Sequence, residues 1–217
     1  MDGCFFVLEM IGVIAFAISG ALTALRSDMD LLGICMLGMI TAVGGGIIRD
    51  ILLGVSPPTA LQKPGAALLA IIVSTFCSFF APKLSHSPKV VKVCSGINLT
   101  LDSVGLAVFT IVGINSAYNI LPQANVFATV FYGTVTAVGG GILRDILSDN
   151  KPAIFVKDFY ACASILGALI YVLLLFLCNK AVASVIGIVF ILIIRFVAAK
   201  FHWQLLRPKE LTKNNDI

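Results

Sequence analysis

Charged residues are scarce in this chain. Asp, Glu, Lys and Arg make up only 12% of its 217 residues, whereas a soluble domain carries roughly a quarter. Hydrophobic residues account for 59%, and the mean hydropathy is +1.04. Apolar runs of about 20 residues, long enough to cross a roughly 30 Å hydrocarbon layer, recur along the chain. This composition excludes a soluble protein and indicates one that crosses the membrane several times.

Several signatures of site chemistry are missing as well. The six cysteines form no Cys-x-x-Cys pair, and His86 and His202 are far apart, so no metal cluster or disulfide framework is expected. No nucleophile–base–acid set occurs within the apolar runs, which argues against an enzyme. The one glycine-rich pattern lacks the Lys-Ser/Thr ending of a phosphate-binding loop. We therefore expect no cofactor and no nucleic-acid partner.

Hydropathy predicts an all-α membrane protein with seven transmembrane helices. The expected spans cover about 4–25, 31–54, 60–81, 97–118, 125–147, 156–178 and 182–200. Asp2 stands where a cleavable signal peptide would have a basic segment, so the first span is expected to stay as a helix. We expect residues 1–217 to form a single transmembrane domain that ends in a cytoplasmic tail at 201–217.

Basic residues are distributed unequally between the two sides of the membrane. Seven spans place the termini on opposite sides. The N-terminal side holds only Arg49, Lys63 and Lys180. The other side holds twelve basic residues: Arg26, Lys83, Lys89, Lys92, Arg144, Lys151, Lys157, Arg195, Lys200, Arg207, Lys209 and Lys213. The positive-inside rule predicts a multi-pass protein of the cell (inner) membrane with its N-terminus outside and its C-terminus in the cytoplasm.

A twelve-residue segment occurs twice. Residues 41–52 read TAVGGGIIRDIL and residues 136–147 read TAVGGGILRDIL, with a single difference. The similarity extends upstream, where LEMIGVIAFAISG (8–20) aligns with LDSVGLAVFTIVG (101–113) and shares its acid, its glycines and its phenylalanine. Because both halves carry the acid, the glycines and the Arg-Asp pair in the same order, they indicate an internal duplication.

The duplication comprises a first repeat at about 4–81 and a second at about 97–178. Each repeat holds three expected spans, an odd number, so the two copies enter the membrane from opposite sides. This arrangement is an inverted-topology repeat, in which the substrate or permeation site tends to lie near the middle of the membrane. The seventh helix, at about 182–200, lies outside the duplication.

Two glycine triplets lie past the middle of the second and fifth spans: Gly44, Gly45 and Gly46, and Gly139, Gly140 and Gly141. Each glycine costs about 1 kcal/mol of helix stability relative to alanine, so a bend or local unwinding is expected there. Carbonyl oxygens freed at membrane depth must face protein or a water-filled cavity, where they suit a monovalent cation. Close helix packing through small residues is the alternative.

An Arg-Asp pair follows each triplet, and a span in each repeat begins with an acid, which gives six charged candidates: Glu9, Arg49, Asp50, Asp102, Arg144 and Asp145. Charges within spans usually face the bundle interior and find partners there. Topology predicts a Glu9–Arg49 pair in the outer leaflet and an Asp102–Arg144 pair in the inner one. A structural clamp is favoured over direct ion binding.

Three hydroxyl residues, Ser19, Thr41 and Thr136, are expected at mid-span depth. Their side chains either line a path or bond back to the carbonyl one turn earlier in the same helix. Arg195, near the cytoplasmic end of the seventh span, is expected to extend to the lipid headgroups.

The inverted repeat, the paired GGGxxRD motifs and the LDSVGLAVFTIVG stretch resemble the prokaryotic branch of the TRIC (trimeric intracellular cation) channel family, whose bacterial members are often described as a glycine transporter domain family. The resemblance covers roughly residues 4–200. It implies a homotrimer in which each protomer has its own pore, formed mainly by spans one, two, four and five. The basic lipid-binding motif of the animal members has no counterpart, because span four carries Asp102 and no lysine.

The resemblance further implies that glycine kinks at 44–46 and 139–141 shape the pore and that monovalent cations, K+ above all, pass through it. A passive cation channel, with K+ or Na+ as the permeant ion and membrane lipids as its surroundings, is therefore the favoured function. The alternative is a secondary transporter for glycine or another small amino acid, because inverted repeats with broken helices are common in transporters.

Overall fold

The structure, a computed structural model, describes residues 3–80, 88–156, 159–201 and 203, with the backbone alone at Cys4, 88–95 and Val156. Nine helices account for the secondary structure of these ranges: α1 (Gly3–Arg26), α2 (Leu31–Leu52), α3 (Thr59–Gln62), α4 (Gly65–Phe80), α5 (Pro88–Ile120), α6 (Val126–Leu147), α7 (Ala153–Val156), α8 (Tyr160–Leu174) and α9 (Lys180–Phe201). Both histidines, several of the counted basic residues and the tail from residue 204 lie outside the described residues.

The lengths of these helices fit a membrane protein. Within the described residues, five helices are long and apolar enough to cross a membrane: Phe5–Arg26, Leu31–Leu52, Gly96–Ile120, Val126–Leu147 and Lys180–Phe201. The expected spans at 60–81 and 156–178 correspond instead to the shorter apolar helices α4 and α8, of 16 and 15 residues. The chain is thus an all-helical membrane protein.

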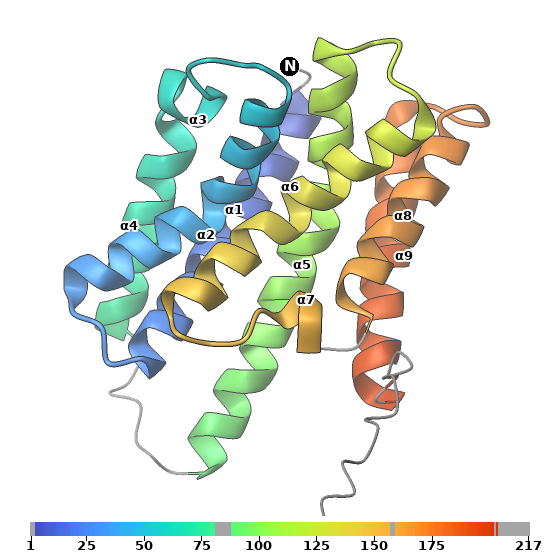
Figure 1. Ribbon diagram of the computed structural model, residues 1–217. Coiled ribbons are helices and arrows are strands. Elements are labelled where there is room, and N and C mark those ends of the chain that lie inside the picture. Colours follow the sequence, from blue (N-terminus) through green and yellow to red (C-terminus); the bar gives the residue numbers. More distant parts are fainter. Residues whose placement is uncertain (1–2, 81–87, 157–158, 202, 204–217) are drawn as a thin grey trace, which may run out of the picture.

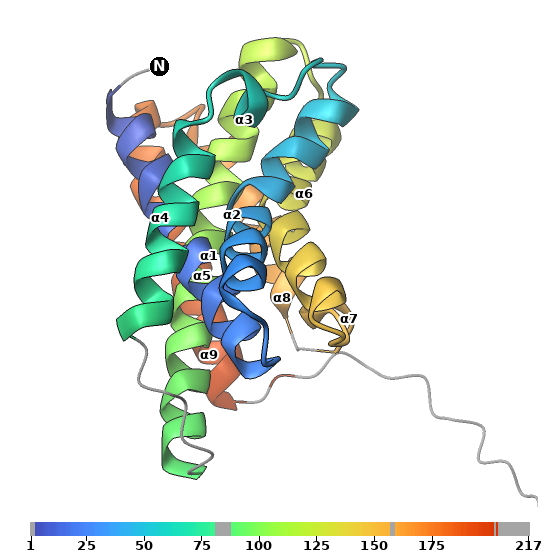
Figure 2. The same ribbon diagram turned by 90° about the vertical axis from the view of Figure 1, so that its left-hand side faces the viewer.

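Four helices, α1, α2, α5 and α6, form the centre of the bundle (Figure 1). α2 packs on α1, α4 and α6, whereas α6 packs on α5 and α8, and α9 covers α5 and α8. The short helices α3 and α7 lie at opposite ends of the bundle, as Figures 1 and 2 both show. The hydropathy pattern did not predict α3 and α7, which follow Pro58 and Pro152.

The glycine triplets bring the backbones of α2 and α6 into direct contact. A Cβ atom added to Gly45 would collide with the carbonyl oxygen of Thr136, and one added to Gly140 would collide with that of Thr41. Both helices run through their triplets as uninterrupted α-helix. The expectation of local unwinding at the triplets is therefore wrong, whereas a bend there stays a prediction, and the glycines allow the close helix packing that the sequence also suggested.

Small residues also allow close contacts between the other central helices. Gly20 of α1 lies against Thr41 of α2, and Gly113 of α5 lies against Thr136 of α6. The Phe16 ring occupies the space over Gly105, and it packs against Phe109 with the ring centroids 5.2 Å apart. Phe16 is 1% exposed, so these rings fill the centre of the bundle.

Both copies of the repeated helix begin and end in the same way. Asp30 caps α2 by accepting from the Gly33 amide at 2.7 Å, and Asn125 caps α6 by accepting from the Ala128 amide at 2.8 Å. Past the other ends, Gly54 and Asp149 have positive φ angles of 73° and 56°. The amide after each of these residues bonds back to the carbonyl of the motif aspartate, which is the Schellman arrangement that terminates helices.

Candidate functional site

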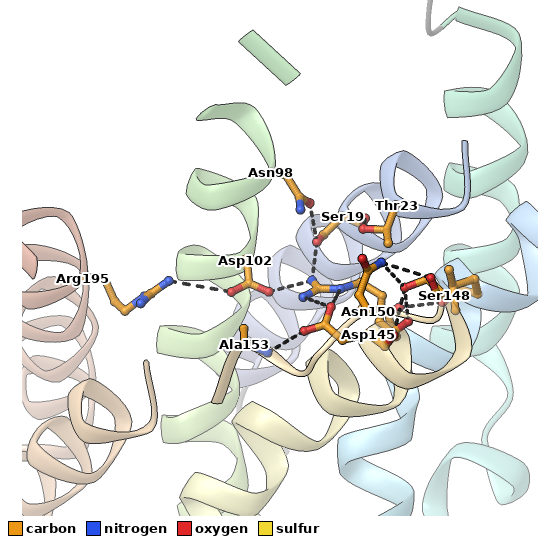
Figure 3. A network of polar contacts seen from close by, with 12 residues as sticks. Ser19, Thr23, Asn98, Asp102, Asp145, Ser148, Asn150, Ala153 and Arg195 are labelled. Atoms are coloured by element: carbon orange, nitrogen blue, oxygen red, sulfur yellow. Dashed lines mark hydrogen bonds and ion pairs between the residues drawn. The ribbon is translucent and has the colours of Figure 1, made fainter. Parts of the chain in front are cut away.

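A buried polar cluster lies between α1, α5 and α6, and Figure 3 shows Ser19, Asp102 and Asp145 turned toward one another there. The guanidinium group of Arg144 is its centre. Its Nη1 donates to Asp102 Oδ1 and to Ser19 Oγ, both at 2.7 Å. Its Nε and Nη2 lie 2.9 and 2.8 Å from Asp145 Oδ1. Arg144 is only 3% exposed, and a cation at that depth is stable only when it is paired. The predicted Asp102–Arg144 pair is thus present.

Ser19 extends this cluster to a residue that sequence analysis missed. Its hydroxyl accepts from Arg144 and donates to Asn98 Oδ1 at 2.7 Å. Asn98 precedes Asp102 by one helical turn, a spacing that places the two side chains on one face of α5. The spacing of Asn98 and Asp102 was the signal by which the sequence could have identified Asn98. We call Ser19, Asn98, Asp102, Arg144 and Asp145 the Arg144 cluster.

The motif aspartates connect the buried arginines to the short helices. Asp145 Oδ1 contacts Arg144, while Asp145 Oδ2 accepts from the Ala153 amide, the first residue of α7, at 2.8 Å. In the first half, Asp50 Oδ2 accepts in the same way from the Thr59 amide, the first residue of α3, at 2.8 Å. Each aspartate therefore holds the start of a short helix against the end of a long one.

The first half has a second charged group, which we call the Arg49 cluster: the buried Arg49 and Asp50 and the partly buried Glu9. Arg49 donates from Nε and Nη2 to Asp50 Oδ1 at 2.9 and 2.6 Å, and Asp50 is 1% exposed. Among the described side chains, Arg49 forms its ion pair with Asp50 and none with Glu9. The predicted Glu9–Arg49 pair is wrong, because Arg49 folds back onto the residue next to it.

Arg195 of α9 also differs from its expectation. It was expected to extend to the lipid headgroups, yet it is 3% exposed and points toward the bundle. Its Nη2 lies 4.0 Å from Asp102 Oδ2, and its guanidinium carbon lies 4.8 Å from the centroid of the Tyr160 ring. Asp102 therefore has Arg144 on one carboxylate oxygen and Arg195 near the other, as Figure 3 shows for Arg195.

The two threonines of the motif use their hydroxyls within their own helices. Thr41 Oγ1 donates to the Leu37 carbonyl, and Thr136 Oγ1 donates to the Tyr132 carbonyl, each at 2.6 Å. Back-bonding to the previous turn is therefore what the structure shows for both. Whether the glycine carbonyls hold a cation stays a prediction. The described residues contain no group of three or more His, Cys, Asp or Glu that suits a metal ion.

These features define a class of protein. A helical membrane bundle that buries paired charges and hydrogen-bonded polar groups among its central helices is a polytopic membrane protein with a polar interior, and such interiors are characteristic of pathways across the bilayer.

Comparison with known proteins gives the family. A model of the family described as "Glycine transporter" matches residues 6–82 and 99–175. The UPF0126 inner membrane protein YadS of Escherichia coli (strain K12) is 36% identical over 200 residues, which cover 91% of this chain and 93% of that protein. The chain belongs to the glycine transporter family, the family of prokaryotic TRIC channels that its motifs indicated.

Solved structures agree with this assignment over nearly the whole chain. The TRIC trimeric intracellular cation channel orthologue from Rhodobacter sphaeroides has a TM-score of 0.83 and 32% identity, and the match covers 93% of this chain and all of that one. A structure that addresses conductance through TRIC cation channels has a TM-score of 0.80 and 37% identity, with 94% and 97% of the two chains covered.

Proposed function

We propose that this protein is a cation channel. The observation that carries the proposal is the likeness to TRIC cation channels, at 37% and 32% identity over more than nine-tenths of the chain. The site is compatible with this function, because cations passing a bilayer need polar groups that replace part of their hydration. The Arg49 and Arg144 clusters supply such groups near the two ends of the central helices.

The path runs along α1, which contributes to both clusters. Glu9 and Ser19 are ten residues apart on this helix, or about 15 Å at 1.5 Å per residue. Glu9 is partly buried and has no ion-pair partner among the described residues, so its carboxylate attracts cations. Phe16 and Phe109 fill the space between the clusters, and conduction requires these rings to move aside.

The finer architecture belongs to the same proposal. Seven spans form two inverted three-helix repeats and a seventh helix, and a bend at each glycine triplet shapes one pore per protomer between α1, α2, α5 and α6. Support comes from the separate family matches to the two halves and from the placement of α3 and α7 at opposite ends. We further propose a homotrimer, in keeping with the trimeric relative.

The orientation is proposed from the basic residues. Three of the counted arginines, Arg49, Arg144 and Arg195, are buried and do not act as loop charges. Without them, two basic residues remain on the N-terminal side and ten on the other, so the positive-inside rule still places the N-terminus outside.

Single-protein recording in planar bilayers tests the channel. Under a K+ gradient, we expect unitary currents that reverse near the K+ equilibrium potential, and bilayers that received protein-free detergent serve as the control. Replacing K+ by Na+ on one side then measures the preference between the two ions. The absence of unitary currents from protein that is folded and trimeric would contradict the proposal.

The alternative is transport of glycine, which the description of the matching family names, whereas the similar solved structures are cation channels. This function predicts saturable uptake of labelled glycine into proteoliposomes and no unitary current. The two measurements on one preparation therefore separate the candidates.

A further inference from the structure

The two charge clusters differ by one buried cation. The Arg49 cluster contains Glu9, Arg49 and Asp50, which sum to a formal charge of −1, and the further cation that acts on Glu9, Lys63, is exposed. The residues at the matching positions of the second half, Asp102, Arg144 and Asp145, also sum to −1, but Arg195 lies against Asp102 and brings that cluster to zero. Arg195 comes from α9, which lies outside both family matches.

The position of Arg195 is determined by packing along one stripe of α9. From Ser184 on, the buried residues of this helix recur every three or four positions, and together with the adjacent Ala183 they are Ser184, Gly187, Ile191, Arg195 and Ala198. A side chain on Gly187 would press on Ile111 of α5, and Ile191 fills the space over Gly167 of α8. This register turns Arg195 toward α5 and away from lipid.

The bonds of Arg195 are few for a buried arginine. Its Nη2 approaches Asp102 Oδ2 only to 4.0 Å, and its Nε has no hydrogen-bond partner. The remaining contact is the ring of Tyr160, whose own buried hydroxyl also lacks a partner. Arg144, by contrast, makes short bonds to three side chains. Arg195 therefore acts on the site mainly through its positive charge and only weakly through hydrogen bonds.

We infer that Arg195 reduces cation occupancy at the Arg144 cluster and thereby makes the two ends of the pathway electrostatically unequal. The inference rests on the proposed function, because it concerns cations in that pathway. A buried charge is screened far less than a loop charge such as the exposed Lys63, so a single guanidinium changes the local cation concentration several-fold. A path with unequal ends passes current more easily in one direction than in the other.

Single-channel current–voltage curves in symmetric KCl test this inference. In about 0.1 M KCl we expect wild-type currents of opposite direction to differ by about twofold at equal voltage. In about 1 M KCl we expect the difference to shrink, because the higher bulk K+ concentration fills both ends of the path whatever their local charge. Arg195→Gln leaves −1 at both ends and is expected to abolish most of this rectification. Arg195→Lys keeps the charge and should retain it.

Lys200→Gln is the matched control. It removes the same charge from the same helix, but at an exposed position, so the wild-type curve should persist. If Arg195→Gln and the wild type rectify equally, the inference is overturned, whereas the proposed channel function still stands. If Arg195→Gln does not fold, the wild-type curves decide. Wild-type rectification that is absent, or that does not change with the KCl concentration, then overturns the inference. If the wild-type protein carries no K+ current, the proposed function is wrong, and this inference fails with it.

Discussion

Gly45 of α2 packs directly on the backbone carbonyl of Thr136 in α6. No side chain lies between the two helices at this contact, so their separation is set by backbone atoms. Because the same contact occurs between Gly140 and Thr41, the crossing has two fixed points. A side chain at either glycine must push the helices apart.

Gly45→Ala is therefore expected to destabilise the protein by about 3 kcal/mol, at the upper end of overpacking in a filled core. Unfolding in mixed detergent micelles measures this loss. Gly46→Ala is the control, because an added Cβ there meets only an arginine nitrogen at 3.8 Å. This variant should gain up to about 1 kcal/mol of helix propensity. Equal effects of the two variants would contradict backbone contact at Gly45.

Arg144→Gln is expected to cost about 3–5 kcal/mol, because it leaves Asp102 and Asp145 as buried carboxylates without their main partner. Adding Asp102→Asn removes one of these unpaired charges. The double variant should therefore lose about 1–3 kcal/mol less than the sum of the single variants. Unfolding of all four proteins under one condition completes the cycle, and strict additivity would show that the pair is not coupled.

Asp50→Ala is expected to loosen the start of α3. The Thr59 amide loses its acceptor, and one net hydrogen bond of about 1.4 kcal/mol corresponds to about tenfold faster exchange. Hydrogen exchange read by mass spectrometry over residues 54–63 measures the change. Asp50→Asn keeps an oxygen that can accept from Thr59 and should exchange more slowly than Asp50→Ala. Unchanged exchange in Asp50→Ala would show that α3 does not depend on this cap.

Thr136→Val is expected to leave the unitary K+ conductance within about twofold of wild type, because the hydroxyl is already bonded to its own helix. Valine has nearly the same shape, so the contact with Gly113 persists. Bilayer recording measures the conductance, and the unfolding of the variant is measured in parallel. A several-fold loss of conductance in a stable variant would place Thr136 on the path.

Much of this arrangement could be predicted from the sequence where the signal is local. Long apolar runs predicted the membrane helices, and the order of acid, glycines and Arg-Asp predicted one of the two proposed charge pairs, in the second half. The Asp102–Arg144 pair followed from topology, because antiparallel spans bring the start of one next to the end of the other. The two shortest spans differ from expectation, because hydropathy does not reveal that a short helix and a bend precede α4 and α8.

Two further errors concern which way a side chain points. Arg195 lies near a helix end, where extension to the headgroups is common, and only the packing of α9 on α5 turns it inward. Arg49 was assigned to Glu9 because topology places the start of the first span next to the end of the second. The Thr59 amide instead holds Asp50 where Arg49 can reach it. Such orientations depend on neighbouring helices, which a single sequence does not locate.

The contact between the two glycine triplets has a consequence for the history of the chain. After a duplication, two copies are ordinarily free to drift apart in sequence. Here the copies are each other's packing surface, so a larger residue in one must be accommodated by the other. Mutual contact of this kind gives a physical reason why eleven of the twelve residues of the repeated segment are still identical.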